Sequence, residues 1–276
     1  MLRDSSSPMQ ACPMNCAPTN SSVIDDADLT EDAFLGGRLL LRQPRSGHRA
    51  GHDAVLLAAA TAARQGNRVV DFGAGVGAAG LAVASRVAGV DLLLVEIDPR
   101  LARLARDNAA ANGIKAEVAA LDVTSSAETF AAAGLLADSV DVVLMNPPFN
   151  DAHRHRASPD EARAAAHVAG PATLEGWVQA ARRVLKSGGA LTLIWRADGI
   201  ADVLAVLARG FGSLQIQPVH GEAAKPAIRV LLRAIKGGRA PARLYRGLVL
   251  NNESTLPKNQ LDEIMAGEGL LPLAMP

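Results

Sequence analysis

Short apolar runs alternate along most of the chain with longer stretches in which apolar residues recur at helical spacing. The apolar runs predict strands at residues 67–72, 90–97, 115–121, 140–145, 190–195, 214–220 and 228–236. The stretches between them predict helices at residues 78–87, 99–112, 171–185 and 200–209. This alternation is typical of parallel strands that are joined by crossover helices.

The last two predicted strands are separated only by residues 221–227, a loop too short for a parallel crossover. We therefore expect these two strands to pair as an antiparallel hairpin. The predicted fold class is α/β, a Rossmann-like, seven-stranded, mostly parallel sheet with an antiparallel C-terminal hairpin and helices on both faces.

The N-terminal end departs from this pattern. Residues 1–32 are rich in Ser, Pro, Asn and Asp and predict a disordered tail. Cys12 and Cys16 both lie in this tail with no His or further Cys nearby, so no metal site is expected. The sequence of 276 residues, 49% of them hydrophobic, suits one main domain at residues 33–246, with residues 247–276 as a C-terminal extension. Ahead of the first strand of the sheet, we expect one or two short strands and a helix at 54–63.

Charge and hydropathy narrow the class of protein further. The 28 Lys and Arg residues balance 28 Asp and Glu residues, so total charge neither demands nor excludes a polyanionic partner. No apolar run approaches the roughly 18 residues of a membrane span, and the N-terminus lacks the layout of a secretory signal. We expect a cytoplasmic protein that does not contact a membrane.

A glycine-rich loop, Asp-Phe-Gly-Ala-Gly-Val-Gly at residues 71–77, joins the first strand of the sheet to its helix. Glycines let the backbone approach a ligand closely, and the helix N-terminus behind them offers free amide donors. Residues 75–80 also satisfy the pattern G-x-G-x-x-G of dinucleotide-binding enzymes. A nicotinamide-dependent oxidoreductase is therefore one alternative that the loop leaves open.

Acidic residues lie at the ends of three of the predicted strands, and they favour a different cofactor. Glu96 is placed to accept from both hydroxyls of a ribose, and Asp122 from an exocyclic adenine amine. Asp71 suits a positively charged group better than the two phosphates of a dinucleotide, which its carboxylate would repel. A sulfonium cofactor with its amino-acid moiety matches this set, and each acid could instead be a helix cap or a turn residue.

Asn146-Pro147-Pro148-Phe149 follows the strand at 140–145, where open α/β sheets bind their ligands. The Asn146 side-chain carbonyl and the Pro147 main-chain carbonyl can accept the two hydrogens of a planar amine and aim its nitrogen at a methyl group. Phe149 can stack on the ring that carries the amine. The proton leaves after attack, so no general base is needed. We take Asn146, Pro147, Pro148 and Phe149 as the catalytic set.

Residues 71–77 and the sequence Val-Glu-Ile-Asp-Pro at 95–99 resemble the first two motifs of class I S-adenosylmethionine-dependent methyltransferases. The resemblance covers about residues 36–236. In that superfamily, Asn-Pro-Pro-Phe/Tyr after the fourth strand marks enzymes that methylate planar nitrogens: adenine N6, guanine N2 in ribosomal RNA, or the glutamine amide of release factors. The resemblance implies cofactor contacts from Asp53, Asp71, Gly73, Ala74, Gly75, Gly77, Glu96, Ile97, Asp122, Val123 and Asn146.

A narrower resemblance rests on residues 45–57 and on residues 157–163 with His167. Together they are similar to the bacterial tRNA1(Val) adenine-37 N6-methyltransferase family, in which the upstream segment usually contains Gly-Thr-Asp-(Ala/Gly)-hydrophobic-Leu-Leu. Here His52 replaces the threonine, and Phe149 replaces a tyrosine and keeps an aromatic face for stacking. The resemblance implies an adenine in tRNA as substrate, with Asp53 near the cofactor.

Other functions stay open at this point. Release-factor glutamine methyltransferases carry an extra helical domain ahead of the first motif, for which residues 31–65 leave little room. Guanine-N2 enzymes often duplicate the domain, and no repeat is visible here. A catalytically silent adenosine-binding module is the remaining alternative.

An RNA substrate should leave a local basic surface. Basic residues cluster in two segments: Arg38, Arg42, Arg45 and Arg49, then Lys225, Arg229, Arg233, Lys236, Arg239, Arg243 and Arg246. His-Arg-His-Arg at 153–156 is interpreted as a loop that closes over the target base, not as a metal cluster. The candidate RNA contacts are Arg45, Arg49, His153, Arg154, Arg156, Lys225 and Arg229, and solvated surface charge is the alternative reading of both segments.

Overall fold

The main sheet is made of strands that are scattered along most of the chain. The computed structural model describes residues 28–46, 49–148, 171–251 and 257–275. The strands of the sheet are β3 (Arg68–Phe72), β4 (Asp91–Glu96), β5 (Ala116–Ala120), β6 (Val140–Met145), β7 (Leu185–Arg196), β8 (Phe211–His220), β9 (Arg229–Lys236), β10 (Arg243–Leu244) and β11 (Leu248–Val249). A separate antiparallel pair is formed by β1 (Leu29–Phe34) and β2 (Leu39–Pro44).

The order of the strands confirms the predicted fold class. The sheet runs β10-β8-β9-β7-β6-β3-β4-β5, and β11 also pairs with β8. Strands β3 to β7 are parallel to one another, whereas β9 is antiparallel to both β7 and β8, as expected for the C-terminal hairpin. In the described part of the chain the sheet has nine strands where seven were expected. The two extra strands, β10 and β11, are two residues long and show no apolar periodicity.

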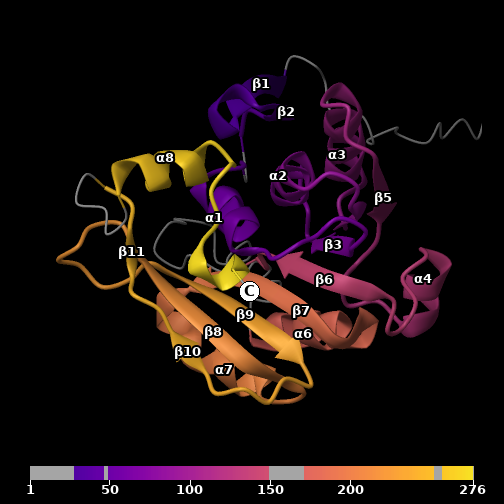
Figure 1. Ribbon diagram of the computed structural model, residues 1–276. Coiled ribbons are helices and arrows are strands. Elements are labelled where there is room, and N and C mark those ends of the chain that lie inside the picture. Colours follow the sequence, from indigo (N-terminus) through magenta and orange to yellow (C-terminus); the bar gives the residue numbers. More distant parts are fainter. Residues whose placement is uncertain (1–27, 47–48, 149–170, 252–256, 276) are drawn as a thin grey trace, which may run out of the picture.

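Helices cover both faces of this sheet (Figure 1). One face carries α1 (His52–Ala60), α2 (Ala78–Arg86) and α3 (Pro99–Ala111), and the other carries α4 (Ala127–Ala132), α6 (Pro171–Val184) and α7 (Ile200–Leu207). The remaining helical segments are η2 (Leu35–Gly37), η3 (Ala197–Gly199), α8 (Lys258–Met265) and η4 (Pro272–Ala274).

Burial on both faces explains why the strands are continuous apolar runs. Successive side chains of a strand point to opposite faces. In β4, Leu92 and Leu94 pack with α1 to α3, and Leu93 and Val95 pack with the helices of the other face. A parallel sheet that is covered on both faces therefore needs an apolar residue at nearly every position.

The N-terminal hairpin begins earlier than the sequence indicates. Residues 1–32 are predicted to form a disordered tail, but Leu29–Phe34 is strand β1, and Leu29 pairs in register with Pro44. The polar residues Thr30, Glu31 and Asp32 interrupt any apolar run here, so the sequence pattern does not reveal the strand. Residues 1–27, with both cysteines, lie outside the described residues.

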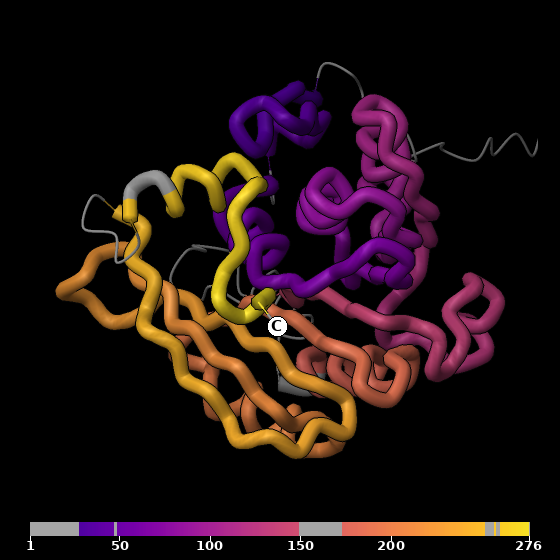
Figure 2. Tube along the Cα trace, in the orientation of Figure 1, coloured from indigo at the N-terminus to yellow at the C-terminus, as the bar shows by residue number. Residues whose placement is uncertain are grey.

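The C-terminal segment packs into the same core as the sheet. The predicted extension, residues 247–276, contributes β11 to the sheet and buries Ile264, Leu271 and Leu273 against the face that carries α1. The Leu271 main-chain N–H donates to the Ala59 carbonyl at 2.9 Å. Figure 2 shows this yellow segment running alongside α1, so the end of the described chain helps to close one face of the sheet. The three-part domain division stays a prediction.

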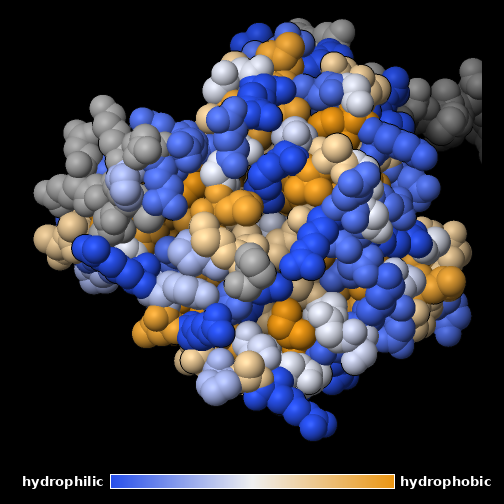
Figure 3. All heavy atoms as spheres, viewed as in Figure 1, coloured by the Kyte–Doolittle hydropathy of each residue, from blue (hydrophilic) through white to orange (hydrophobic). Residues whose placement is uncertain are grey.

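The surface in the view of Figure 3 is mainly polar, with apolar side chains in small groups. Large exposed apolar side chains, such as Ile97 and Leu244, come from different elements. Within the described ranges, no helix combines the length and the apolar character that crossing a membrane requires.

Candidate active site at the carboxyl ends of the strands

Neighbouring strands bring the predicted cofactor residues to one edge of the sheet. Phe72 pairs in register with Val95 of β4 and with Met145 of β6. Glu96 directly follows Val95, and Asn146 directly follows Met145. The glycine loop that follows Phe72 therefore lies between Glu96 and Asn146. Asp122 follows β5, the strand beyond β4.

The glycines of the loop have two different roles. Gly73, Gly75 and Gly77 have φ angles of +68°, +57° and +91°, a region that favours glycine. A Cβ atom on Gly73 would lie 2.4 Å from Trp177 Cη2, so this glycine is needed for close packing. A Cβ atom on Gly75 would meet no atom of the described residues within 4 Å. Gly75 thus borders open space, as expected where a ligand approaches the backbone.

Glu96 holds the loop against β4. Its side chain is 6% exposed, Oε2 accepts from the Gly75 N–H at 2.7 Å and Oε1 accepts from the Asp98 N–H at 2.9 Å. A carboxylate has about four acceptor positions, so both oxygens can still accept from ligand hydroxyls. The bond to Gly75 is a structural role that the sequence does not reveal.

Asp71 lies beneath the loop. The residue is 2% exposed, and Oδ2 accepts from the Gly80 N–H in the first turn of α2 at 2.8 Å. Burial raises the pKa of Asp71 to about 7, against the lowering effect of the Gly80 bond and with a further rise from the charge of Glu96. Asp71 therefore supports the helix that the loop enters, and its contact with a positive group stays a prediction.

The residues around Glu96 offer both apolar and polar surface. Ile97 is 63% exposed directly after the buried Glu96. Asp122 is partly exposed, and its Oδ1 accepts from the N–H and the hydroxyl of Thr124, both at 2.8 Å. Ala74 and Val123 are buried, and Ala74 donates its N–H to the Val95 carbonyl. An exposed apolar side chain beside two carboxylates suits a nucleoside.

Asn146 has an acceptor that nothing in the described part of the chain uses. The residue is half-buried, and its side-chain oxygen is buried without a hydrogen-bond partner among the described residues. Pro147 is buried and Pro148 is exposed, whereas Phe149 lies outside the described residues. A buried carbonyl oxygen without a donor is costly, so this atom is suited to a donor that a ligand brings.

Asp53 and Arg229 pair with each other near the same edge. Arg229 Nε donates to Asp53 Oδ2 at 3.0 Å, and both side chains are about three-quarters buried, at 25% and 29% exposed. The pair joins the first turn of α1 to the start of β9. The resemblance assigns Asp53 to the cofactor and the charge pattern assigns Arg229 to RNA; both roles stay predictions.

The other candidate RNA contacts differ in how they are placed. Arg49 is held by Asp32 at 2.7 Å, by Thr30 and by the Pro44 carbonyl, so it braces the β1–β2 hairpin. Lys225 is exposed and pairs with Glu222 at 2.6 Å, and Arg45 is exposed. His153, Arg154 and Arg156 lie outside the described residues, as do residues 157–163 and His167.

Asn108 is a site residue that the sequence did not single out. The residue is fully buried, and its Nδ2 donates to the carbonyls of Arg42 and Val76, both at 3.0 Å. Its Oδ1 accepts from the Arg42 N–H at 2.8 Å. Asn108 thereby ties α3 to the hairpin and to the middle of the glycine loop. The available signal was a polar residue four positions after Leu104, on the apolar face of the helix.

In comparisons with known proteins, the chain is similar to methyltransferases. The family model for the methyltransferase small domain matches residues 49–220. The chain is 28% identical over 216 residues to a tRNA1(Val) (adenine(37)-N6)-methyltransferase of Dickeya chrysanthemi, covering 77% of this chain and 82% of that protein.

Two further relatives bear other descriptions. A crystal structure from Agrobacterium tumefaciens, described as a predicted O-methyltransferase, is 32% identical with a TM-score of 0.65 and covers 79% of this chain and 98% of that one. A release factor glutamine methyltransferase of Chlorobaculum tepidum is 25% identical over 154 residues, or 54% of this chain and 52% of that protein.

Proposed function

This chain belongs to the methyltransferase small domain family and is an S-adenosylmethionine-dependent methyltransferase, and we propose that it methylates the N6 amine of an adenine in tRNA. The observation that carries the proposal is the Asn146 side-chain oxygen, which is buried at the carboxyl end of β6 with no donor among the described residues. An amine is a donor that can satisfy this atom.

The residues at the edge fit the proposed methyl donor. S-adenosylmethionine supplies an electrophilic methyl group on a sulfonium together with an adenosine. Glu96 has acceptor capacity for ribose hydroxyls, and the exposed side chain of Ile97 offers an apolar surface to the adenine. No described residue lies within 4 Å of a Cβ atom placed on Gly75, which leaves room for a ligand beside the backbone.

The acceptor side of the site orients the nitrogen that is methylated. The Asn146 side-chain oxygen and the Pro147 main-chain oxygen each accept one hydrogen of the amine, which directs its lone pair toward the methyl group. These oxygens stabilise the positive charge that develops on the nitrogen. Phe149 stacks on the base in this proposal. The proton is released after transfer, when the amine has become acidic.

The number of hydrogens on the group that receives the methyl distinguishes an amine from a hydroxyl. An amine offers one hydrogen to each of the two oxygens, whereas a hydroxyl offers only one hydrogen in total. Nitrogen is therefore favoured here, although the Agrobacterium relative is described as a predicted O-methyltransferase. The share of each relative that is matched supports tRNA over a release factor as the substrate. The match covers 82% of the tRNA methyltransferase from Dickeya and 52% of the release factor methyltransferase from Chlorobaculum.

A competition between substrates tests the proposal. The full chain is incubated with labelled S-adenosylmethionine, total bacterial tRNA and release factor in one tube, and the RNA is then digested to nucleosides. We expect the label in N6-methyladenosine. Label in the protein fraction, in a guanosine or on a ribose oxygen would contradict the proposed substrate and leave the methyltransferase assignment intact.

A further inference from the structure

A second candidate site lies at the amino ends of the strands, at the opposite edge of the sheet from Asn146. An open cavity of about 560 Å³ is enclosed by the linker between α1 and β3, by the start of β7 and by the C-terminal segment. Its polar lining comes from Arg64, Asn67, Asp141, Lys186, Ser187 and Arg233. Since β6 has six residues, the two edges are about 20 Å apart.

A bulge at the start of β7 shapes this cavity. Val140 of β6 pairs with Leu185, but Val142 pairs with Ala190, so residues 186–189 bulge out of the ladder. Gly188 has a φ angle of +80°, which favours glycine at this bend. Helix α6 ends at Val184, and Gly188 and Gly189 lie in the bulge that carries Lys186.

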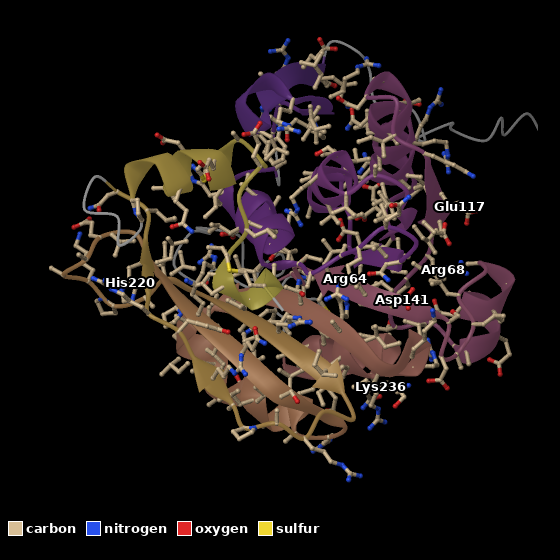
Figure 4. All side chains as sticks on the ribbon, in the orientation of Figure 1. Arg64, Arg68, Glu117, Asp141, His220 and Lys236 are labelled. Carbon is tan, nitrogen blue, oxygen red and sulfur yellow. The ribbon has the colours of Figure 1, made fainter. Side chains whose placement is uncertain are left out.

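Most of the cations at this edge are neutralised. Lys186 pairs with Asp141 at 2.7 Å and Lys236 with Asp138 at 2.6 Å. Arg68 lies 3.6 Å from Asp91. Figure 4 shows Arg64, Arg68, Asp141 and Lys236 on the side of the sheet away from His220, which ends β8 at the carboxyl edge.

Two arginines of the cavity differ from these cations. Neither Arg64 nor Arg233 has an acidic partner within the described ranges, and Arg233 Nε is buried without any acceptor there. Burial lowers the pKa of Arg233; Tyr245 raises it, and the charge of Arg64 lowers it further. Both arginines line the same cavity, so two like charges share it without an acidic partner in the described ranges. An anion bound there would offset their repulsion.

We propose that this cavity binds a phosphate group between Arg64 and Arg233, with Lys186 as a third donor. Guanidinium groups match the geometry of phosphate oxygens and bind them through paired hydrogen bonds. Lys186 Nζ has three hydrogens and uses one of them on Asp141. The volume exceeds that of a single phosphate, so the group belongs to a free phosphate compound or to an RNA backbone. This site is independent of the proposed methyl transfer.

Phosphate binding by the full chain is measured by calorimetry with inorganic phosphate at constant ionic strength. Arg64 is exposed and lies in a linker, so the variant Arg64→Gln should fold normally. We expect its affinity for phosphate to fall about tenfold or more, the effect of losing one charge-assisted interaction. Arg103→Gln, which removes the same charge from an exposed position on α3, is the matched control and should bind phosphate like the natural chain.

A second arm identifies the source of the phosphate. Total tRNA binding is measured for the same variants by filter retention. If Arg64→Gln loses affinity for phosphate but not for tRNA, the site takes a small phosphate compound. If it loses affinity for both, and Arg103→Gln loses neither, the site takes an RNA backbone phosphate. A loss of tRNA affinity with unchanged phosphate affinity would contradict the proposal. If Arg64→Gln behaves like Arg103→Gln in both arms, the proposal is wrong.

Discussion

Single buried polar atoms decide the chemistry of the carboxyl edge. Glu96 uses its carboxylate to hold the glycine loop, and Asn146 keeps a buried oxygen that no described residue satisfies. Sequence position alone predicted that both residues lie at strand ends. It could not show that the two differ in this way, because the partners of a side chain depend on segments distant in sequence.

Asp71 makes the stability of the protein depend on pH. Its pKa is raised from 3.8 to about 7 in the folded state, so the folded protein holds a proton that the unfolded chain loses above about pH 4. The stabilisation is complete below pH 3.8 and is lost as the pH rises through about 7. Asp71→Asn has no such titration and can still accept from the Gly80 N–H.

The measurement is urea unfolding of both forms at a series of pH values between 4 and 8. Asp71→Asn should gain stability relative to the natural chain as the pH rises across this range. A stability difference that does not change with pH would show that Asp71 is ionised in the folded protein.

At the scale of elements, local patterns predicted most of the fold. The apolar run at 140–145 coincides with β6, and the helix predicted at 171–185 ends one residue earlier. The missed element α4 has six residues, too few to show a helical period, although Ser126 caps it through the Thr129 N–H. Strand β1 was missed because its polar residues Thr30, Glu31 and Asp32 leave no apolar run.

Asn108 couples two elements through one side chain. Asn108→Leu leaves the carbonyls of Arg42 and Val76 and the N–H of Arg42 without their partners. We expect a loss of about 3 kcal/mol in the free energy of unfolding, since each unsatisfied buried group costs about 1 kcal/mol or more. The glycine loop should loosen as well, so affinity for S-adenosylmethionine should fall.

Asn112→Leu is the matched control for this variant. Asn112 bonds the main chain of Leu40 on the same hairpin but does not reach the glycine loop. It is only half-buried, so its loss should cost about 1 kcal/mol and leave cofactor affinity unchanged. Urea unfolding and calorimetry measure the two effects, and equal cofactor affinity in both variants would contradict a tether to the loop.

At the scale of the molecule, the two edges of one sheet present different electrostatic surroundings. The carboxyl edge gathers Glu96, Asp122 and the Asn146 oxygen that no described residue satisfies, which suits a cationic cofactor and an amine. The amino edge holds Arg64 and Arg233 without acidic partners in the described ranges. The sequence indicated basic segments, but it could not show which cations are neutralised, because their partners lie in other strands and loops.

The central claim is that the Asn146 oxygen accepts a hydrogen of the amine that is methylated. Its most direct test is the rate of methyl transfer to tRNA adenine by Asn146→Ala under single-turnover conditions, alongside calorimetry with S-adenosylmethionine. We predict a rate reduced about 100-fold or more, the usual effect of removing an oriented hydrogen-bonding group, with cofactor affinity within about threefold of the natural chain. A variant that transfers methyl groups at the natural rate would contradict the account.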